Sequence, residues 1–127
     1  MKKGDLERQL QQWLALYLHM HRLLYCASAY GFYTSKVQAG KIKKAGYRAG
    51  FPDMFIYEPR GKYHGMAIEL KMGSRTTLEQ KGWRSALCER GYYAVIMPTN
   101  LTYRQAQDWL EKEIEDYLKG EQHDPSS

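Results

Sequence analysis

Cysteine is scarce in this 127-residue sequence, and its scarcity excludes two kinds of small protein. Cys26 and Cys88 are too few for a disulfide framework and too few for a cysteine-based zinc site. Long apolar runs are also lacking: no stretch approaches the ~20 apolar residues of a membrane-spanning helix. The N-terminus has no apolar core of a signal peptide. We therefore expect a soluble protein of the cytoplasm, with no membrane partner.

Internal repeats, low-complexity blocks and nucleotide-binding fingerprints are missing too. What is present is an ordinary globular composition, with 43% hydrophobic and 26% charged residues, which argues against a disordered chain. The length is that of one domain. We expect a single domain over residues 1–120 and a disordered tail over residues 121–127.

The net charge of +5 hides an uneven distribution. Residues 108–127 contain seven acids and two bases, so the rest of the chain is strongly basic. Five bases fall between positions 36 and 48 with no acid among them: Lys36, Lys41, Lys43, Lys44 and Arg48. Such a segment suits a polyanion such as DNA, because neutralised phosphates release counterions. The alternative is a solvated loop. Tyr33 and Tyr47 lie in the same segment and are candidates for stacking on bases.

Hydrophobic periodicity and turn signals predict a single α/β domain. A polar, glycine-punctuated stretch over residues 27–50 is interpreted mostly as loop. The predicted elements are a helix over residues 5–22, hairpin strands over 53–58 and 64–71, a helix between Thr77 and Gly91, a strand over 92–97 and a helix between Thr102 and Gly120.

The predicted hairpin brings charged residues together. With its turn centred on Gly61, residues whose numbers sum to 122 face each other, so Asp53 lies opposite Glu69. Alternation then sends Asp53, Glu69 and Lys71 to one face of the hairpin and the apolar residues to the other. The apolar set is Met54, Ile56, Met66, Ile68 and Leu70.

Two facing carboxylates repel each other, and a divalent cation resolves the repulsion. Mg²⁺ or Mn²⁺ takes oxygen ligands from one or two carboxylates, water and a substrate phosphate. Lys71 beside the cation can orient water or stabilise charge on the phosphorus. This set indicates metal-assisted hydrolysis of a phosphodiester. The alternative interpretation is a cross-strand ion pair on a solvated face. The basic loop and the upstream turn Gly50-Phe51-Pro52-Asp53 argue against this alternative.

The order Asp53, then Glu69-Leu70-Lys71, resembles the PD-(D/E)xK nuclease core. More narrowly, residues 48–54, 68–71, 78–80 and 88–92 together resemble the VRR-NUC domain family, in its small stand-alone phage or bacterial form. The resemblance implies a restriction-endonuclease-like fold, a mixed sheet flanked by helices, and DNA cleavage that depends on Mg²⁺ or Mn²⁺. The segment before the basic loop lacks the asparagine that is usual in the family.

Site roles follow from the same resemblance. It implies that Asp53, Glu69 and the Leu70 carbonyl hold the metal, that Lys71 is catalytic and that Gln80 supports the site. Glu7 matches an acidic position near the metal. From the residues alone, Gln80 is equally half of a capping box, and Glu7 a favourable charge at a helix N-terminus. Arg75 is a further candidate for phosphate contact, although charged residues of this kind are usually only solvated.

The expected function is a structure-selective DNA endonuclease. A four-way junction presents two symmetric strands, so a homodimer that resolves Holliday junctions is the preferred substrate hypothesis. The alternatives are a nicking or flap nuclease without junction preference, and a non-catalytic nucleic-acid-binding module of the same fold.

Overall fold

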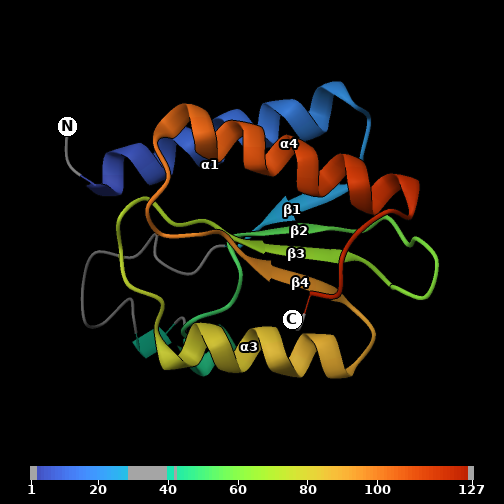
Figure 1. Ribbon diagram of the computed structural model, residues 1–127. Coiled ribbons are helices and arrows are strands. Elements are labelled where there is room, and N and C mark those ends of the chain that lie inside the picture. Colours follow the sequence, from blue (N-terminus) through green and yellow to red (C-terminus); the bar gives the residue numbers. More distant parts are fainter. Residues whose placement is uncertain (1–2, 29–39, 42, 126–127) are drawn as a thin grey trace.

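The computed structural model describes residues 3–28, 40–41 and 43–125. In this part of the chain a mixed sheet of four strands is flanked by three helices, as the sequence predicts (Figure 1). The strands are β1 (Tyr25–Ala27), β2 (Met54–Ile56), β3 (Met66–Glu69) and β4 (Tyr93–Ile96), in the order β1-β2-β3-β4. The first two pairings are antiparallel, and β3 pairs with β4 in parallel through the crossover helix α3. The helices are α1 (Lys3–Met20), α3 (Leu78–Glu89) and α4 (Tyr103–Lys119).

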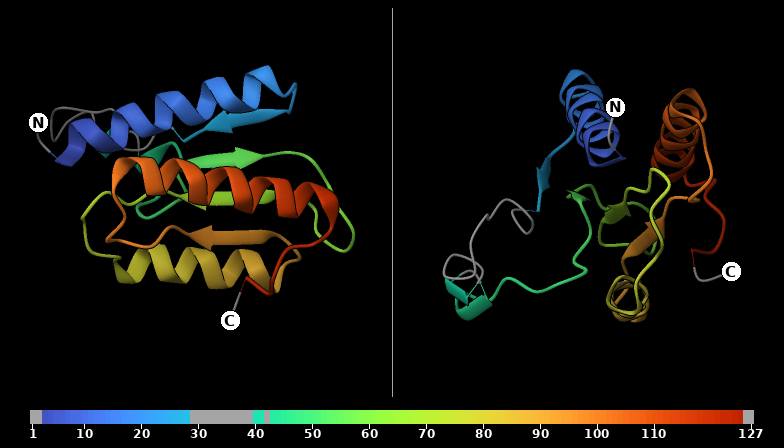
Figure 2. Two further views of the ribbon diagram at one scale, coloured as in Figure 1. Left: turned by 45° about the horizontal axis from the view of Figure 1, so that its top comes forward. Right: turned by 90° about the vertical axis from the view of Figure 1, so that its left-hand side faces the viewer.

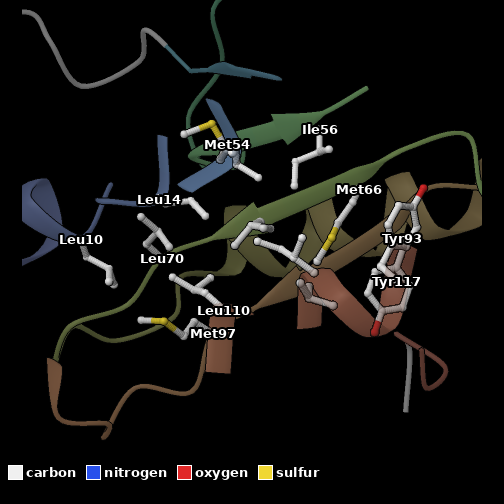
Figure 3. Packing of buried hydrophobic residues seen from close by; sticks show 14 of the residues in the cluster. Leu10, Leu14, Met54, Ile56, Met66, Leu70, Tyr93, Met97, Leu110 and Tyr117 are labelled. Atoms are coloured by element: carbon white, nitrogen blue, oxygen red, sulfur yellow. The ribbon is translucent and has the colours of Figure 1, made fainter. Parts of the chain in front are cut away.

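The helices cover both faces of the sheet: α1 and α4 lie side by side on one face and α3 lies on the other (Figure 2). The larger apolar cluster fills the space under α1 and α4 (Figure 3). Leu10, Leu14 and Leu18 of α1 are fully buried there, as the predicted apolar stripe requires. A smaller cluster joins Phe55 and Ala67 to α3. Both faces of the central strands are therefore buried, whereas the alternation in the sequence suggested one polar face.

The hairpin register is as predicted. Met54 pairs with Ile68 and Ile56 with Met66, so the paired numbers sum to 122. The strands are shorter than the sequence indicates, and β1 lies where the sequence analysis expects no strand. β1 has only three residues, and it is defined by antiparallel pairing with β2. Such a short edge strand leaves no alternation to detect, because tertiary pairing alone sets it.

The caps of α3 and α4 also follow the sequence. Thr77 and Thr102 each accept a hydrogen bond from the backbone N–H three residues on, and the glutamine there completes a capping box. Gly120 ends α4 in the left-handed conformation. Among the described residues no helix is both long and apolar enough to cross a membrane.

The segment after α4, which we expected to be a disordered tail, makes contacts with the domain over residues 121–125. His123 Nε2 lies 2.8 Å from Glu113 Oε1, and Arg84 donates to the Pro125 carbonyl at 2.6 Å. The second oxygen of Glu113 accepts from the buried Tyr93 hydroxyl at 3.0 Å. Residues 126–127 lie outside the described part.

Candidate active site

Asp53 and Glu69 lie at neighbouring strand ends, on the side of the sheet that carries α3. Asp53 directly precedes β2, and Glu69 is the last residue of β3. The Leu70 backbone N–H donates to Asp53 Oδ2 at 2.8 Å, which fixes the aspartate across the strand pair. Glu69 is 7% exposed. Two acidic side chains are thus held together in a largely dry place.

Burial and proximity change the acidity of both carboxyl groups. Burial raises the pKa of Asp53, an effect only partly opposed by hydrogen bonds from Glu69 and Leu70. Burial and the adjacent Asp53 charge raise the pKa of Glu69 to about 10. The neutral Glu69 carboxyl donates to the Asp53 carboxylate, so without a cation the pair shares a proton at neutral pH.

This sharing predicts how stability depends on pH in the absence of metal. Because the folded protein holds a proton on Glu69 that the unfolded chain releases above its ordinary pKa of 4.5, stability falls as pH rises toward about 10. We expect the melting temperature in EDTA to decrease from pH 6 to pH 9. Added Mg²⁺ should raise it more at pH 9, because the cation binds the deprotonated pair. Thermal melts at both pH values test this, and a metal-free melting temperature that rises over this range would contradict it.

Lys71 follows the same strand and is only 3% exposed. Its charge lowers the pKa of both Asp53 and Glu69, which places the ammonium group within electrostatic reach of the two acids. Lys71 Nζ donates to the Arg75 backbone carbonyl at 3.1 Å. The Arg75 side chain is exposed, so this residue holds the lysine through its backbone and leaves its guanidinium group facing solvent.

Glu7 of α1 reaches the same region from the other side of the sheet end. Its Oε1 accepts from the Met72 N–H at 2.9 Å and from the Ser74 hydroxyl at 2.8 Å. Its charge also raises the pKa of Asp53 and of Glu69. Glu7 therefore ties the loop after β3 to α1 and adds negative charge to the site. Ser74 is a partner that the sequence analysis missed, because nothing in the sequence places it next to a residue 67 positions away.

Gln80 performs both roles that the sequence left open. Its Oε1 accepts from the Thr77 N–H at 3.0 Å and completes the cap of α3. Its Nε2 donates to Glu69 Oε2 at 3.0 Å. One amide thus fixes the start of the helix and orients the glutamate.

The segment leading into Asp53 packs on the first turn of α3. Gly50 has a φ of +80°, and a Cβ added there would lie 2.6 Å from Glu79 Cβ and 2.8 Å from the Gln80 nitrogen. Trp83 Nε1 donates to the Ala49 carbonyl at 3.0 Å. These contacts place the motif before β2 directly against the turn that carries Gln80.

The predicted basic residues lie near this segment of the chain. Lys41, Lys43, Lys44 and Arg48 are exposed, and Lys36 lies outside the described residues, as does Tyr33. The Arg48 guanidinium carbon lies 4.8 Å from the centre of the Trp83 ring. The sequence analysis did not single out Trp83. The signal available was its position three residues after Gln80, which puts both on one side of α3.

The donor set suits a hard divalent cation. Asp53 and Glu69 offer two carboxylates, and Mg²⁺ commonly uses one or two protein carboxylates together with water and phosphate oxygens. The Leu70 carbonyl is the further ligand that the family resemblance implies. The repulsion built into the pair is what such an ion relieves. Within the described ranges no cluster of three or more acidic, histidine or cysteine ligands is formed. Glu7, with its Oε1 bound to the loop after β3, accordingly does not complete such a cluster.

Comparisons with known proteins agree with this fold. No family model and no curated protein matches the sequence. A solved structure described as a VRR_NUC domain protein superposes with a TM-score of 0.65 and 26% sequence identity, covering 94% of this chain and 89% of that one. The match confirms the restriction-endonuclease-like fold and supports a nuclease domain. Over nearly its whole length, the chain is therefore similar in fold to a VRR_NUC domain protein.

Proposed function

We propose that this protein is a metal-dependent DNA endonuclease whose site consists of Asp53, Glu69, Lys71 and Gln80. The observation that carries the proposal is the buried pair of carboxylates on adjacent strands with an ammonium group within reach. A purely structural pair would gain nothing from that repulsion. The nuclease-type neighbour supports the same conclusion.

Asp53, Glu69 and the Leu70 carbonyl are the proposed ligands of Mg²⁺ or Mn²⁺, which when bound would polarise the phosphate and acidify water. Glu69 is held in position by Gln80, and Asp53 by the Leu70 N–H. Lys71 stabilises the negative charge that develops on the phosphate as water attacks. A bond forms between water oxygen and phosphorus, the bond to one sugar oxygen breaks, and the products are a phosphate monoester and a hydroxyl group. Glu7 is proposed to position the loop after β3.

The experiment compares wild type with Lys71→Ala on labelled four-way junction, flap and linear duplex DNA, with Mg²⁺, Mn²⁺ or EDTA. We expect cleavage by wild type only, and only with metal. DNA binding without cleavage under every condition would instead favour a non-catalytic module of the same fold. Cleavage in EDTA, or by Lys71→Ala at the wild-type rate, would contradict the proposed chemistry.

Branched DNA is the proposed substrate, and a homodimer the proposed assembly. A single chain of 14.9 kDa supplies one site, whereas resolving a four-way junction needs two symmetric cuts. Backbone contacts carry no sequence code, so recognition is expected to rest on DNA shape, with Lys36, Lys41, Lys43, Lys44, Arg48 and Arg75 contacting phosphates. If the protein is a monomer in analytical sedimentation and cuts linear duplex as fast as junctions, the proposed substrate and assembly are refuted. A preference for flap DNA would favour the alternative of a flap nuclease.

Gln80→Glu separates the two roles of Gln80. Glutamate keeps the capping acceptor for the Thr77 N–H, so the melting temperature should change little. It also replaces a donor to Glu69 by a second carboxylate, and losing a hydrogen bond to a charged group should lower cleavage about tenfold or more. Thr77→Ala is the matched control: it should lose about 1 kcal/mol of stability with little loss of cleavage. Equal cleavage by Gln80→Glu and wild type would contradict the assigned contact.

A further inference from the structure

A cavity lies beside the proposed site, on the outer side of the segment that leads into Asp53. Its volume is about 320 Å³, and its walls are Arg48, Ala49, Glu79, Gly82, Trp83 and Ala86. That volume is at the small end of the range for small-molecule sites. Only Trp83 and Ala86 among these are even partly buried, so the cavity is open to a ligand from solvent.

The two largest side chains in the wall, Arg48 and Trp83, pack against each other. Arg48 lies over the Trp83 ring at 4.8 Å, Phe51 meets the same ring edge-on at 4.9 Å, and Trp83 Nε1 is held by the Ala49 carbonyl. A second cavity, of about 200 Å³, reaches the same Arg48–Trp83 pair from the side of Tyr47 and Phe51. Tyr47 is 44% exposed. An aromatic ring stacked with a guanidinium group is the kind of surface on which proteins hold unpaired bases.

The cavity is close to the proposed point of cleavage. Trp83 is three residues after Gln80, a rise of about 4.5 Å along the helix, and Gln80 donates directly to Glu69. Ala49 is four residues before Asp53, a separation of at most about 14 Å. If the phosphate to be cut lies at Asp53 and Glu69, a base one to a few nucleotides away along the same strand would therefore reach the cavity.

Gly82 supports the same interpretation. It lies inside α3, where glycine is unfavourable compared with alanine. A Cβ at this position would meet nothing within 4 Å, so packing does not require glycine there. Its effect is to leave the cavity wall open.

We propose that this cavity binds one unpaired nucleobase of the substrate, stacked on the Arg48–Trp83 surface, and so directs cleavage to DNA with an unpaired base beside the cut phosphate. The inference rests on the proposed nuclease function for its biological use, but base binding is measurable without cleavage. The charge of Arg48 and the nearby lysines favours the adjoining phosphates.

Binding is tested in EDTA by fluorescence anisotropy, with labelled duplexes that carry a single-adenine bulge, the same bulge with an abasic residue, or no bulge. Wild type should bind the adenine bulge roughly 5- to 150-fold more tightly than the abasic bulge, the range expected for one base–aromatic stack. Equal binding of the two bulges by the wild-type protein would overturn the proposal, so this test needs no variant.

Two variants locate the effect. Trp83→Leu should bring the ratio of the two affinities close to one, and Trp109→Leu, on the helix at the opposite face of the sheet, should leave it unchanged. Because Trp83 also holds the Ala49 carbonyl, Gly82→Leu serves as an independent variant: it fills the cavity from a position with open space and should not lower the melting temperature. Gly82→Leu should also remove the discrimination, and a folded Gly82→Leu that retains it would refute the assigned place.

The outcome distinguishes this inference from the proposed function. Base discrimination that depends on Trp83 and Gly82, in a protein that cleaves no DNA, would support the base site and refute the nuclease. Metal-dependent cleavage with no discrimination between the bulges would support the nuclease and refute the base site.

Discussion

Replacing Glu69 by glutamine should abolish DNA cleavage and, at the same time, raise the melting temperature of the metal-free protein. Glutamine has nearly the same shape, and its amide oxygen can still accept the 3.0 Å hydrogen bond from Gln80. Its NH₂ group can donate to Asp53. The variant thus keeps the hydrogen bonds of the neutral Glu69 carboxyl. Wild type must take up a proton on Glu69 when it folds above pH 4.5, whereas the amide needs none, so the variant should be more stable than wild type above neutral pH.

Cleavage by Glu69→Gln should fall at least about 100-fold, because a neutral amide is a much weaker ligand for a hard cation than a carboxylate. Each kcal/mol of stability gained in this way should raise the melting temperature by roughly 3–6 °C in a domain of this size. Melts in EDTA at pH 8 and cleavage assays with Mn²⁺ check the two effects. Glu89→Gln, an exposed acid at the far end of α3, should change neither. A variant that is both active and less stable would show that Glu69 is a structural acid.

The second large effect is expected for Gly50→Ala. The added Cβ would meet the Cβ and the backbone carbon of Glu79 and the Gln80 nitrogen, at 2.6, 2.7 and 2.8 Å. Two of these are backbone atoms of a capped helix turn, so no side-chain rotation relieves the clash. The φ of +80° adds a conformational cost for any residue with a Cβ. Together these costs should lower stability by about 2–5 kcal/mol.

Gly46→Ala is the matched control for Gly50→Ala. Gly46 also has a positive φ, of 100°, but a Cβ there would meet nothing within 4 Å. It should therefore show only the conformational cost, about 1–2 kcal/mol. Moving the first turn of α3 also moves Gln80 away from Glu69, so Gly50→Ala should lose cleavage even at temperatures where it is folded. Urea unfolding of both variants measures the two losses of stability. Equal losses would contradict the packing described for Gly50.

The hairpin shows how much of the site could be predicted from sequence. Alternation over two strands and one turn determines a register, and a one-residue slip would have moved Asp53 and Glu69 to the wrong face. The observed pairing of Met54 with Ile68 agrees with that prediction. The caps at Thr77 and Thr102 are equally local, because residue types three positions apart specify them.

Other parts of the site depend on contacts that local patterns do not encode. β1 exists because β2 offers it a pairing edge, and Glu7 finds the Met72 N–H across 65 positions of sequence. The second apolar cluster, between the sheet and α3, made the polar face of the hairpin a buried one, and that burial accounts for the raised pKa of Glu69. The wall formed by Arg48 and Trp83 likewise joins a loop to a helix 35 residues later.

Calorimetric titration of Mn²⁺ into the metal-free protein tests the shared cation site most directly. Wild type should bind the ion with a measurable heat, and the Asp53→Asn, Glu69→Gln double variant should lose that heat. Binding to wild type should also release protons at pH 7, because the pair is partly protonated before the ion binds. Identical uptake by wild type and a folded double variant, or none by wild type with or without DNA, would contradict the account.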